Sequence, residues 1–149
     1  MSAIARQNRI EISGSSDQTI QLGQDLASSL RNRDVLVLTG PLGAGKTCLI
    51  RGIAIGLGVN DDDIKSPSFT LVNEYAGSHL PFFHIDLYRM KDTSELYNIG
   101  WDDYLMRDGI VAVEWGEKAA DFLPKKRIEI SIVILSDNER RISIDFINS

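Results

Sequence analysis

One octapeptide constrains this chain more than any other feature: Gly40-Pro41-Leu42-Gly43-Ala44-Gly45-Lys46-Thr47. It matches the pattern G-x-x-x-x-G-K-[ST], in which glycines let consecutive backbone N–H groups turn toward an anion. Lys46 supplies a cation for the outer phosphates of a nucleotide, and Thr47 offers a hydroxyl to Mg²⁺. A helix that begins near Gly45 directs the positive end of its dipole at the same anion. The sequence therefore predicts a polyphosphate site at this loop.

The flanking segments have the patterns that such a loop requires. The run from Val35 to Leu38 is apolar on both faces, as expected for a central strand that is covered by helices on each side. Beyond the loop, apolar residues return at helical spacing, and Gly58 is placed to end that helix. The loop is thus expected to connect a buried strand to an amphipathic helix.

Composition limits the classes of protein that the chain can belong to. Its 149 residues, 43% of them hydrophobic, predict one globular domain over 1–149. With 25% charged residues, no apolar stretch near the ~20 residues of a membrane span and no leader-like start, we expect a soluble, cytoplasmic protein without a membrane partner. The formal net charge of -5 argues against independent nucleic-acid binding, and the basic cluster Lys125–Arg127 is interpreted as a solvated loop. The lone cysteine, Cys48, is interpreted as a packing residue rather than a reactive thiol.

Further patterns predict an α/β architecture. A capping-box sequence and helical spacing favour a helix over 17–30. The apolar runs 82–85 and 110–113 predict buried strands, and alternation over 128–134 and 142–146 around a polar turn predicts an antiparallel hairpin. We therefore expect a P-loop NTPase-type sandwich, with a mixed sheet of parallel core strands and a C-terminal antiparallel hairpin. Ligand should bind at the carboxyl ends of the parallel strands.

Two acids follow the predicted buried strands and are candidates for catalysis. Nucleotide hydrolysis at a phosphate loop needs an acid at the end of a neighbouring strand to hold Mg²⁺. We favour Glu114 for the metal, because it ends the cleaner apolar strand, and Asp86 for orienting water or the hydration shell of the metal. The alternative for each acid is a cap on a nearby turn. His84 is interpreted as a hydrogen-bonded core residue, with proton transfer as the alternative.

Two further features have more than one interpretation. Trp115 could stack on a nucleobase or pack beneath the loop. The segment 66–70, with sequence SPSFT, lies where switch segments sense the γ-phosphate through hydroxyls, and the alternative is a turn that leads into a strand. The sequence leaves both pairs of interpretations open.

Four motifs together resemble the TsaE (YjeE) family of bacterial ATPases. They are the phosphate loop, KSPSFTLV at 65–72, HIDLYR at 84–89 and VEW at 113–115, and their order and spacing match from about Thr19 to Pro124. Two positions depart from the family pattern: Ser68 stands where threonine is most common, and Cys48 where a second threonine is frequent. The C-terminal hairpin matches by periodicity alone.

The resemblance implies a small ATPase that is required to make threonylcarbamoyladenosine in tRNAs that decode codons starting with A. It implies that TsaD and TsaB are its partners, that it resets their complex, and that tRNA is met only through that complex. It also implies roles for the site residues: Lys46, Asp86 and Glu114 in catalysis, Thr47 and Glu114 in binding Mg²⁺, and nucleotide contacts from the loop, Trp115, Ser16 and Thr19. The nucleotide-contacting positions of the loop are Leu42, Gly43, Ala44, Gly45, Lys46, Thr47 and Cys48.

Three other functions use the same loop. A small-molecule kinase would usually need an arginine-bearing lid, and the sequence has no arginine-rich insertion. A GTPase would normally carry an Asn/Thr-Lys-x-Asp segment, which is absent from the sequence. A nucleotide-switched adaptor without significant hydrolysis is the strongest alternative. Because Arg89 is the one candidate for an arginine finger, we expect hydrolysis by the isolated protein to be slow.

Overall fold

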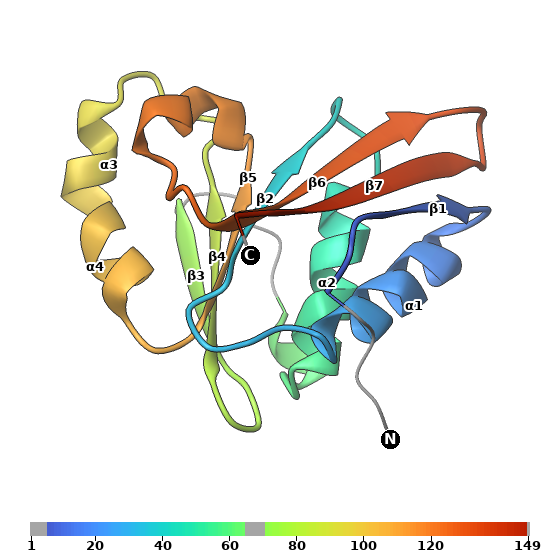
Figure 1. Cartoon of the computed structure of the whole chain (residues 1–149), viewed down its shortest axis with the longest axis horizontal. Helices are drawn as coiled ribbons and strands as arrows, with labels where there is room; N and C mark the ends of the chain where they lie inside the picture. The colour runs from blue at the N-terminus through green and yellow to red at the C-terminus, as the bar shows by residue number, and fades with distance from the viewer. Residues whose placement is uncertain (1–5, 65–70, 149) are drawn as a thin grey trace.

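The computed structural model describes residues 6–64 and 71–148, and a seven-stranded mixed sheet forms its centre (Figure 1). The strands lie in the order β1-β7-β6-β2-β5-β4-β3. Their bounds are β1 (Arg9–Ser13), β2 (Val35–Thr39), β3 (Val72–Ala76), β4 (Pro81–Asp86), β5 (Ile110–Glu114), β6 (Arg127–Ile134) and β7 (Arg140–Ile147). The helices are α1 (Ser16–Ala27), α2 (Lys46–Gly56), α3 (Ser94–Ile99) and α4 (Trp101–Met106), with short 3-10 segments η1 (Asp61–Asp63) and η2 (Gly116–Phe122).

The parallel core of the sheet is confirmed. β2 pairs in parallel with both β5 and β6, and β4 pairs in parallel with β5. The C-terminal hairpin is also confirmed, and it joins the sheet through β6 beside β2 while β7 pairs antiparallel with β6. The sequence did not reveal β1, which pairs antiparallel with β7 at the sheet edge. Its apolar residues Ile10 and Ile12 are 65% and 54% exposed, whereas the more buried positions are the polar residues Arg9, Glu11 and Ser13, so no buried apolar face marked this strand.

Helices cover the two faces of the sheet in two separate groups. α1 and α2 pack on one face against residues such as Leu36, Leu38 and Ile130. α3, α4 and η2 pack on the other face against Val37 and Phe83. Figure 1 shows α1 and α2 beneath β1, β6 and β7, with α3 and α4 on the far side of β4 and β3. Because β2 is buried by helices on both faces, its four residues Val35–Leu38 are apolar, as its sequence predicted.

The first helix begins as the capping pattern predicted and ends earlier. The Ser15 hydroxyl accepts a hydrogen bond from the Gln18 N–H at 3.1 Å and so caps the N-terminus of α1. The helix ends at Ala27 rather than at Leu30, because Ser28, Ser29 and Leu30 donate their N–H groups to carbonyls three residues back. The prediction of helix over 17–30 was therefore wrong for its last turn, where apolar spacing continues without α-helical hydrogen bonding.

Close packing of α1 against α2 depends on small residues at their contact. A Cβ added to Gly52 would lie 2.0 Å from the Ile20 carbonyl oxygen, and one added to Gly23 would lie 2.4 Å from the Leu49 carbonyl oxygen. Only glycine permits this approach of the two backbones. Since α2 begins at Lys46, this contact fixes the position of the phosphate loop relative to α1.

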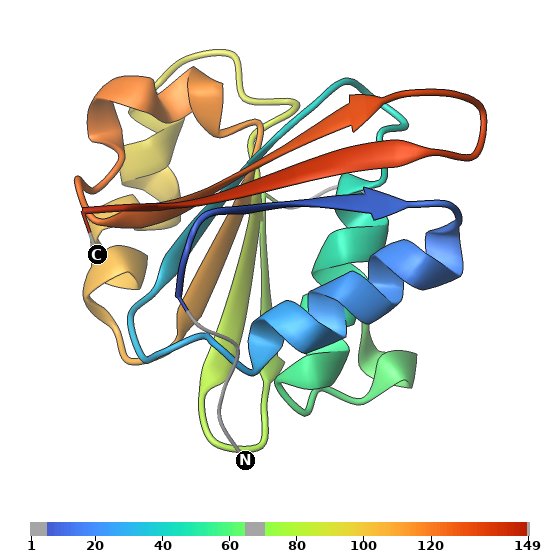
Figure 2. The same ribbon diagram turned by 45° about the vertical axis from the view of Figure 1, so that its right-hand side comes forward.

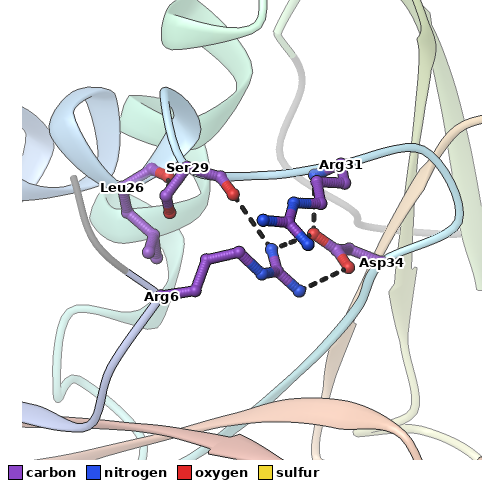
Figure 3. A network of polar contacts seen from close by, with 5 residues as sticks. All are labelled: Arg6, Leu26, Ser29, Arg31 and Asp34. Carbon is purple, nitrogen blue, oxygen red and sulfur yellow. Dashed lines mark hydrogen bonds and ion pairs between the residues drawn. The ribbon is translucent and has the colours of Figure 1, made fainter. Parts of the chain in front are cut away.

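An ion pair ties the start of the described chain to the loop before β2 (Figure 3). The Arg6 guanidinium donates to both carboxylate oxygens of Asp34, at 2.8 and 3.1 Å, and to the Ser29 carbonyl at 2.9 Å. The Arg31 N–H donates to the same Asp34 carboxylate at 2.6 Å. Only 7% of the Asp34 side chain is exposed, so these bonds compensate a carboxylate that has lost most of its water.

Candidate functional site

A cavity of about 660 Å³ opens at the carboxyl ends of the parallel strands. Every residue that the sequence assigned to the site lines this cavity: Ser16, Thr19, Leu42, Gly43, Ala44, Gly45, Lys46, Thr47, Cys48, Asp86, Glu114 and Trp115. These residues come from α1, the loop after β2, the start of α2, and the ends of β4 and β5. The structure thus brings the predicted residues together, while their individual roles remain predictions.

The phosphate loop has the backbone conformation that its glycines allow. Gly40, Gly43 and Gly45 have φ values of 153°, 80° and 104°, which residues with a Cβ rarely adopt. Gly45 precedes α2 in the left-handed region, and no side chain caps that helix. The first N–H groups of α2, at Lys46 and the residues after it, are therefore available for an anion at the helix N-terminus.

The Lys46 side chain forms part of the cavity wall. Its ammonium donates to the Gly40 carbonyl at 2.5 Å and lies 3.5 Å from the centre of the Trp115 ring. The residue is only 5% exposed, and burial lowers the pKa of its ammonium below the ordinary 10.5, against the opposing effect of Glu114, Glu117 and Asp86. A polyanion bound here would favour the charged form of Lys46, because a nearby opposite charge stabilises an ammonium.

The two acids are neighbours across β4 and β5 but differ in their surroundings. Asp86 and Glu114 are register partners, so their side chains leave the same face of the sheet. Asp86 is partly exposed and accepts a hydrogen bond from the Tyr88 N–H at 3.0 Å. Burial raises the pKa of the Asp86 carboxyl above 3.8, and the charge of Glu114 adds to this shift. Glu114 is 3% exposed.

His84 contacts the Glu114 carboxylate from the adjacent strand. His84 Nε2 and Glu114 Oε2 are 2.7 Å apart, and His84 is 2% exposed. The structure agrees with the interpretation of His84 as a hydrogen-bonded core residue, and its partner is the acid that we favoured for the metal. This hydrogen bond holds one carboxylate oxygen of Glu114, which fixes the direction in which the carboxylate faces the cavity.

Trp115 lines the cavity and contacts two other lining side chains. Its backbone has a left-handed φ of 60°, and its backbone N–H donates to the Leu38 carbonyl at 3.2 Å. The centre of its ring lies 5.2 Å from the centre of the Tyr88 ring and 3.5 Å from the Lys46 ammonium. The Trp115 ring therefore lies beside Lys46 of the phosphate loop, and both interpretations of Trp115, stacking on a nucleobase and packing beneath the loop, stay predictions.

The residues at the α1 side of the cavity differ in what they offer a ligand. Ser16 is exposed, and Leu42, at the tip of the phosphate loop, is 69% exposed. Thr19 is 3% exposed, and its hydroxyl is already bonded to the Ser13 hydroxyl at 2.7 Å and to the Ser15 carbonyl at 3.2 Å. Cys48 is half-buried in the first turn of α2. The Thr19 hydroxyl therefore already has two partners within the protein.

Sequence reasoning missed one wall of the cavity, formed by Asp137, Asn138 and Arg140 at the tip of the β6–β7 hairpin. The polar turn itself was predicted, but only the parallel pairing of β6 with β2 brings its tip beside the phosphate loop. The proposed switch segment 66–70 lies outside the described residues. None of the helices in the described parts of the chain is long and apolar enough to cross a lipid bilayer.

These features define a class of protein. A loop of sequence GPLGAGKT connects a central parallel strand to a helix, and two strand-end acids line the same cavity as this loop. The chain therefore has a P-loop α/β fold, as its sequence predicted. A crystal structure of YdiB from Bacillus subtilis superposes with a TM-score of 0.77 at 31% identity, covering 97% of this chain and 89% of that one.

Comparisons of sequence give the particular family. The model of the "Threonylcarbamoyl adenosine biosynthesis protein TsaE" family matches residues 13–142. A TsaE protein from Treponema pallidum is 37% identical over 133 residues, covering 89% of this chain and 97% of its own. Another from Bacillus subtilis is 39% identical over 127 residues, covering 85% and 78%. The chain belongs to the TsaE family, which confirms the resemblance that its four motifs carry.

Proposed function

We propose that the chain binds ATP and ADP with Mg²⁺ and hydrolyses ATP slowly, as an accessory protein of tRNA threonylcarbamoyladenosine biosynthesis. In this proposal it resets a complex of TsaB and TsaD in the cytoplasm and meets tRNA only through that complex. Family membership supports the pathway. The observation that carries the nucleotide chemistry is the single cavity that joins the phosphate loop to Asp86 and Glu114.

The chemistry of the available donors is compatible with Mg²⁺ bound together with a nucleotide. Thr47, Asp86 and Glu114 offer oxygen ligands to one cavity, and Mg²⁺ prefers oxygen. Among the described residues, no group of three His, Cys, Asp or Glu side chains could hold a metal ion. Mg²⁺ usually takes one or two protein oxygens and completes its shell with phosphate and water. Thr47 and Glu114 would hold the ion, which supplies positive charge to the phosphates when bound.

The other residues have roles that follow from their positions. Lys46 would neutralise the outer phosphates, and the N–H groups of the loop and the first turn of α2 would bind phosphate oxygens. Asp86, partly exposed and next to Glu114, would orient the water that attacks the terminal phosphorus. His84 would keep Glu114 directed at the site through their 2.7 Å hydrogen bond.

Thermal unfolding with ATP and Mg²⁺ tests nucleotide binding. At a ligand concentration about 100 times the Kd, binding stabilises the folded state by about 2.7 kcal/mol, which raises Tm by roughly 5–10 °C in a chain of this size. Lys46→Ala should remove this shift and leave the fold intact. Lys126→Ala, an exposed lysine outside the cavity, is the matched control and should retain the shift. Equal stabilisation of Lys46→Ala by ATP would refute the assignment of the loop.

Two further measurements test the metal and the partners. Glu114→Gln should weaken the dependence of nucleotide binding on Mg²⁺ more than Asp86→Asn does, and the opposite ranking would exchange their roles. ATP hydrolysis should accelerate when the TsaB and TsaD proteins are added. An unchanged rate on mixing would favour a stand-alone role. A partner-dependent change in nucleotide affinity without turnover would favour a nucleotide-switched adaptor.

A further inference from the structure

Another cavity, of about 180 Å³, opens at the amino ends of the parallel strands. Its lining includes Val35, where β2 begins, and Ile128, next to the start of β6. Figure 2 shows β2 and β6 both beginning on the side of the sheet away from the β6–β7 turn, whereas the phosphate loop follows the other end of β2. Among the residues that the structure describes, none lines both this cavity and the one at the phosphate loop.

Positive charge dominates the lining of this cavity. One lining residue, Asp34, is acidic, and four are basic. The basic residues are Arg6, Arg33, Lys126 and Arg127. The chain as a whole has the opposite balance, with a formal net charge of -5. The Asp34 carboxylate is already compensated, because it accepts two hydrogen bonds from the Arg6 guanidinium and one from the Arg31 N–H (Figure 3). The charge that remains for a ligand is therefore positive.

Two of these cations are held in fixed positions. The Arg6 guanidinium also donates to the Ser29 carbonyl, and only 11% of its side chain is exposed. Arg127 Nε donates to the Glu129 carboxylate at 2.8 Å, and Arg127 Nη1 donates to the Pro124 carbonyl at 3.0 Å. A guanidinium carries more N–H donors than these contacts use, so donors remain on both side chains. Arg6 and Arg127 thus form a rigid cationic wall.

The other two cations are available to a ligand. Lys126 is exposed, and within the described parts of the chain its ammonium makes no hydrogen bond or ion pair. Arg33 is 62% exposed, and its Nε lies 3.4 Å from Asp108 Oδ1, a surface ion pair of the kind that contributes little. The Arg33 backbone has a left-handed φ of 71°, which is uncommon for a residue with a Cβ, and its N–H donates to the Gly109 carbonyl at 2.7 Å. A backbone held in such a conformation is typical of functional sites.

We propose that this cavity binds a phosphate group, with Lys126 and Arg33 as direct ligands. The two side chains come from separate loops, one before β6 and one before β2, so they approach a ligand from different directions. A phosphate presents charged oxygens in several directions, whereas a carboxylate presents two in one plane. The volume is below the roughly 300 Å³ at which small-molecule pockets begin, so the site takes a single anionic group rather than a whole nucleotide. Free phosphate and the phosphates of an RNA backbone share this chemistry.

Two-dimensional NMR of the backbone amides tests the site in the full chain. Titration with inorganic phosphate at constant ionic strength should shift the amides of residues 32–35 and 126–128 saturably. Lys126→Gln and Arg33→Asn should each weaken this binding about tenfold, the loss expected for one charge-assisted hydrogen bond. Asparagine is chosen because it tolerates the left-handed backbone at this position. Lys91→Gln removes the same charge from an exposed lysine outside both cavities, so it is the control and should leave the affinity unchanged.

Further titrations identify the source of the phosphate and the result that would overturn the inference. A short oligouridylate that displaces phosphate from the same amides would support the site and assign it to an RNA backbone. Phosphate that binds where the oligouridylate does not would support a site for free phosphate. Acetate that shifts these amides as strongly as phosphate, or the absence of a saturable shift with both phosphate and oligouridylate, would overturn the inference.

This inference does not depend on nucleotide binding, and the two can fail separately. Lys46→Ala should keep the phosphate-dependent shifts of residues 126–128, because the phosphate loop lies at the other end of the sheet. Loss of these shifts in Lys46→Ala would show that phosphate acts through the phosphate loop and would also overturn the inference. Wild-type protein that binds phosphate at residues 126–128 but binds no ATP would instead refute only the proposed function.

Discussion

Replacing Gly52 with alanine tests how tightly α1 must pack on the helix that follows the phosphate loop. The new Cβ would lie 2.0 Å from the Ile20 carbonyl oxygen and 3.0 Å from the Gly23 Cα. Both atoms belong to the backbone of α1, so no side-chain rotation relieves the overlap. The helices must separate locally by on the order of 1 Å to restore an ordinary contact, a change that a densely packed interior opposes.

The expected magnitude follows from two opposing effects. Overpacking a dense interior costs typically about 1–3 kcal/mol. Alanine in place of glycine favours a helix interior by about 1 kcal/mol. The overlap here is with backbone and is severe, so we expect a net loss of about 1–2 kcal/mol in the free energy of unfolding. For a chain of this size the corresponding decrease in Tm is roughly 2–8 °C.

The assay is urea unfolding together with differential scanning calorimetry, both without nucleotide. Gly14→Ala is the control, because its Cβ would meet only the flexible end of Gln18, at 3.2 Å, and should shift Tm little. Because α2 begins at Lys46, Gly52→Ala should also weaken ATP binding. A Gly52→Ala variant as stable as the wild type, or more stable, would refute the argument that backbone contact sets the distance between these helices.

Three further predictions concern polar groups that are buried or partly buried. Arg6→Ala should lower the free energy of unfolding by about 3 kcal/mol in urea, because it leaves the buried Asp34 carboxylate without its cation; a loss below about 1 kcal/mol would contradict this. His84→Ala should lower the free energy of unfolding by about 1–3 kcal/mol, because it leaves Glu114 without its hydrogen-bonded neighbour, and His84→Gln should recover part of that loss. Equal stability of both variants and the wild type would show that this hydrogen bond does not stabilise the fold. Burial raises the pKa of Asp86 in the folded state above 3.8, so the folded state binds more protons there than the unfolded state and loses stability as pH rises through that raised pKa. Without nucleotide, Asp86→Asn lacks this loss, so the stability of the variant relative to the wild type should increase from about pH 4 to pH 7. A stability difference that is constant with pH would disprove the raised pKa of Asp86.

Local patterns in the sequence determined the parts of the protein that depend on near neighbours in the chain. Three local features each specify a backbone conformation or a burial pattern within a few residues. They are the glycines and Lys46 of the phosphate loop, the capping serine of α1 and the apolar residues of β2. For this reason the loop, its flanking strand and helix, and the parallel core could be predicted. The same patterns carried the family resemblance, which the comparisons confirm.

Tertiary structure alone decided which distant segments share the site. β1 was hidden because its apolar side chains face solvent at a sheet edge, so only pairing with β7 makes it a strand. The contact between His84 and Glu114 depends on the register of β4 against β5, and the contact of Arg140 with Ala44 depends on β6 lying beside β2. Such contacts join residues that are far apart in the chain, and their strand order and register are set by burial of the whole sheet. A periodic pattern records which face of a segment is buried, but it does not record which other segment covers that face.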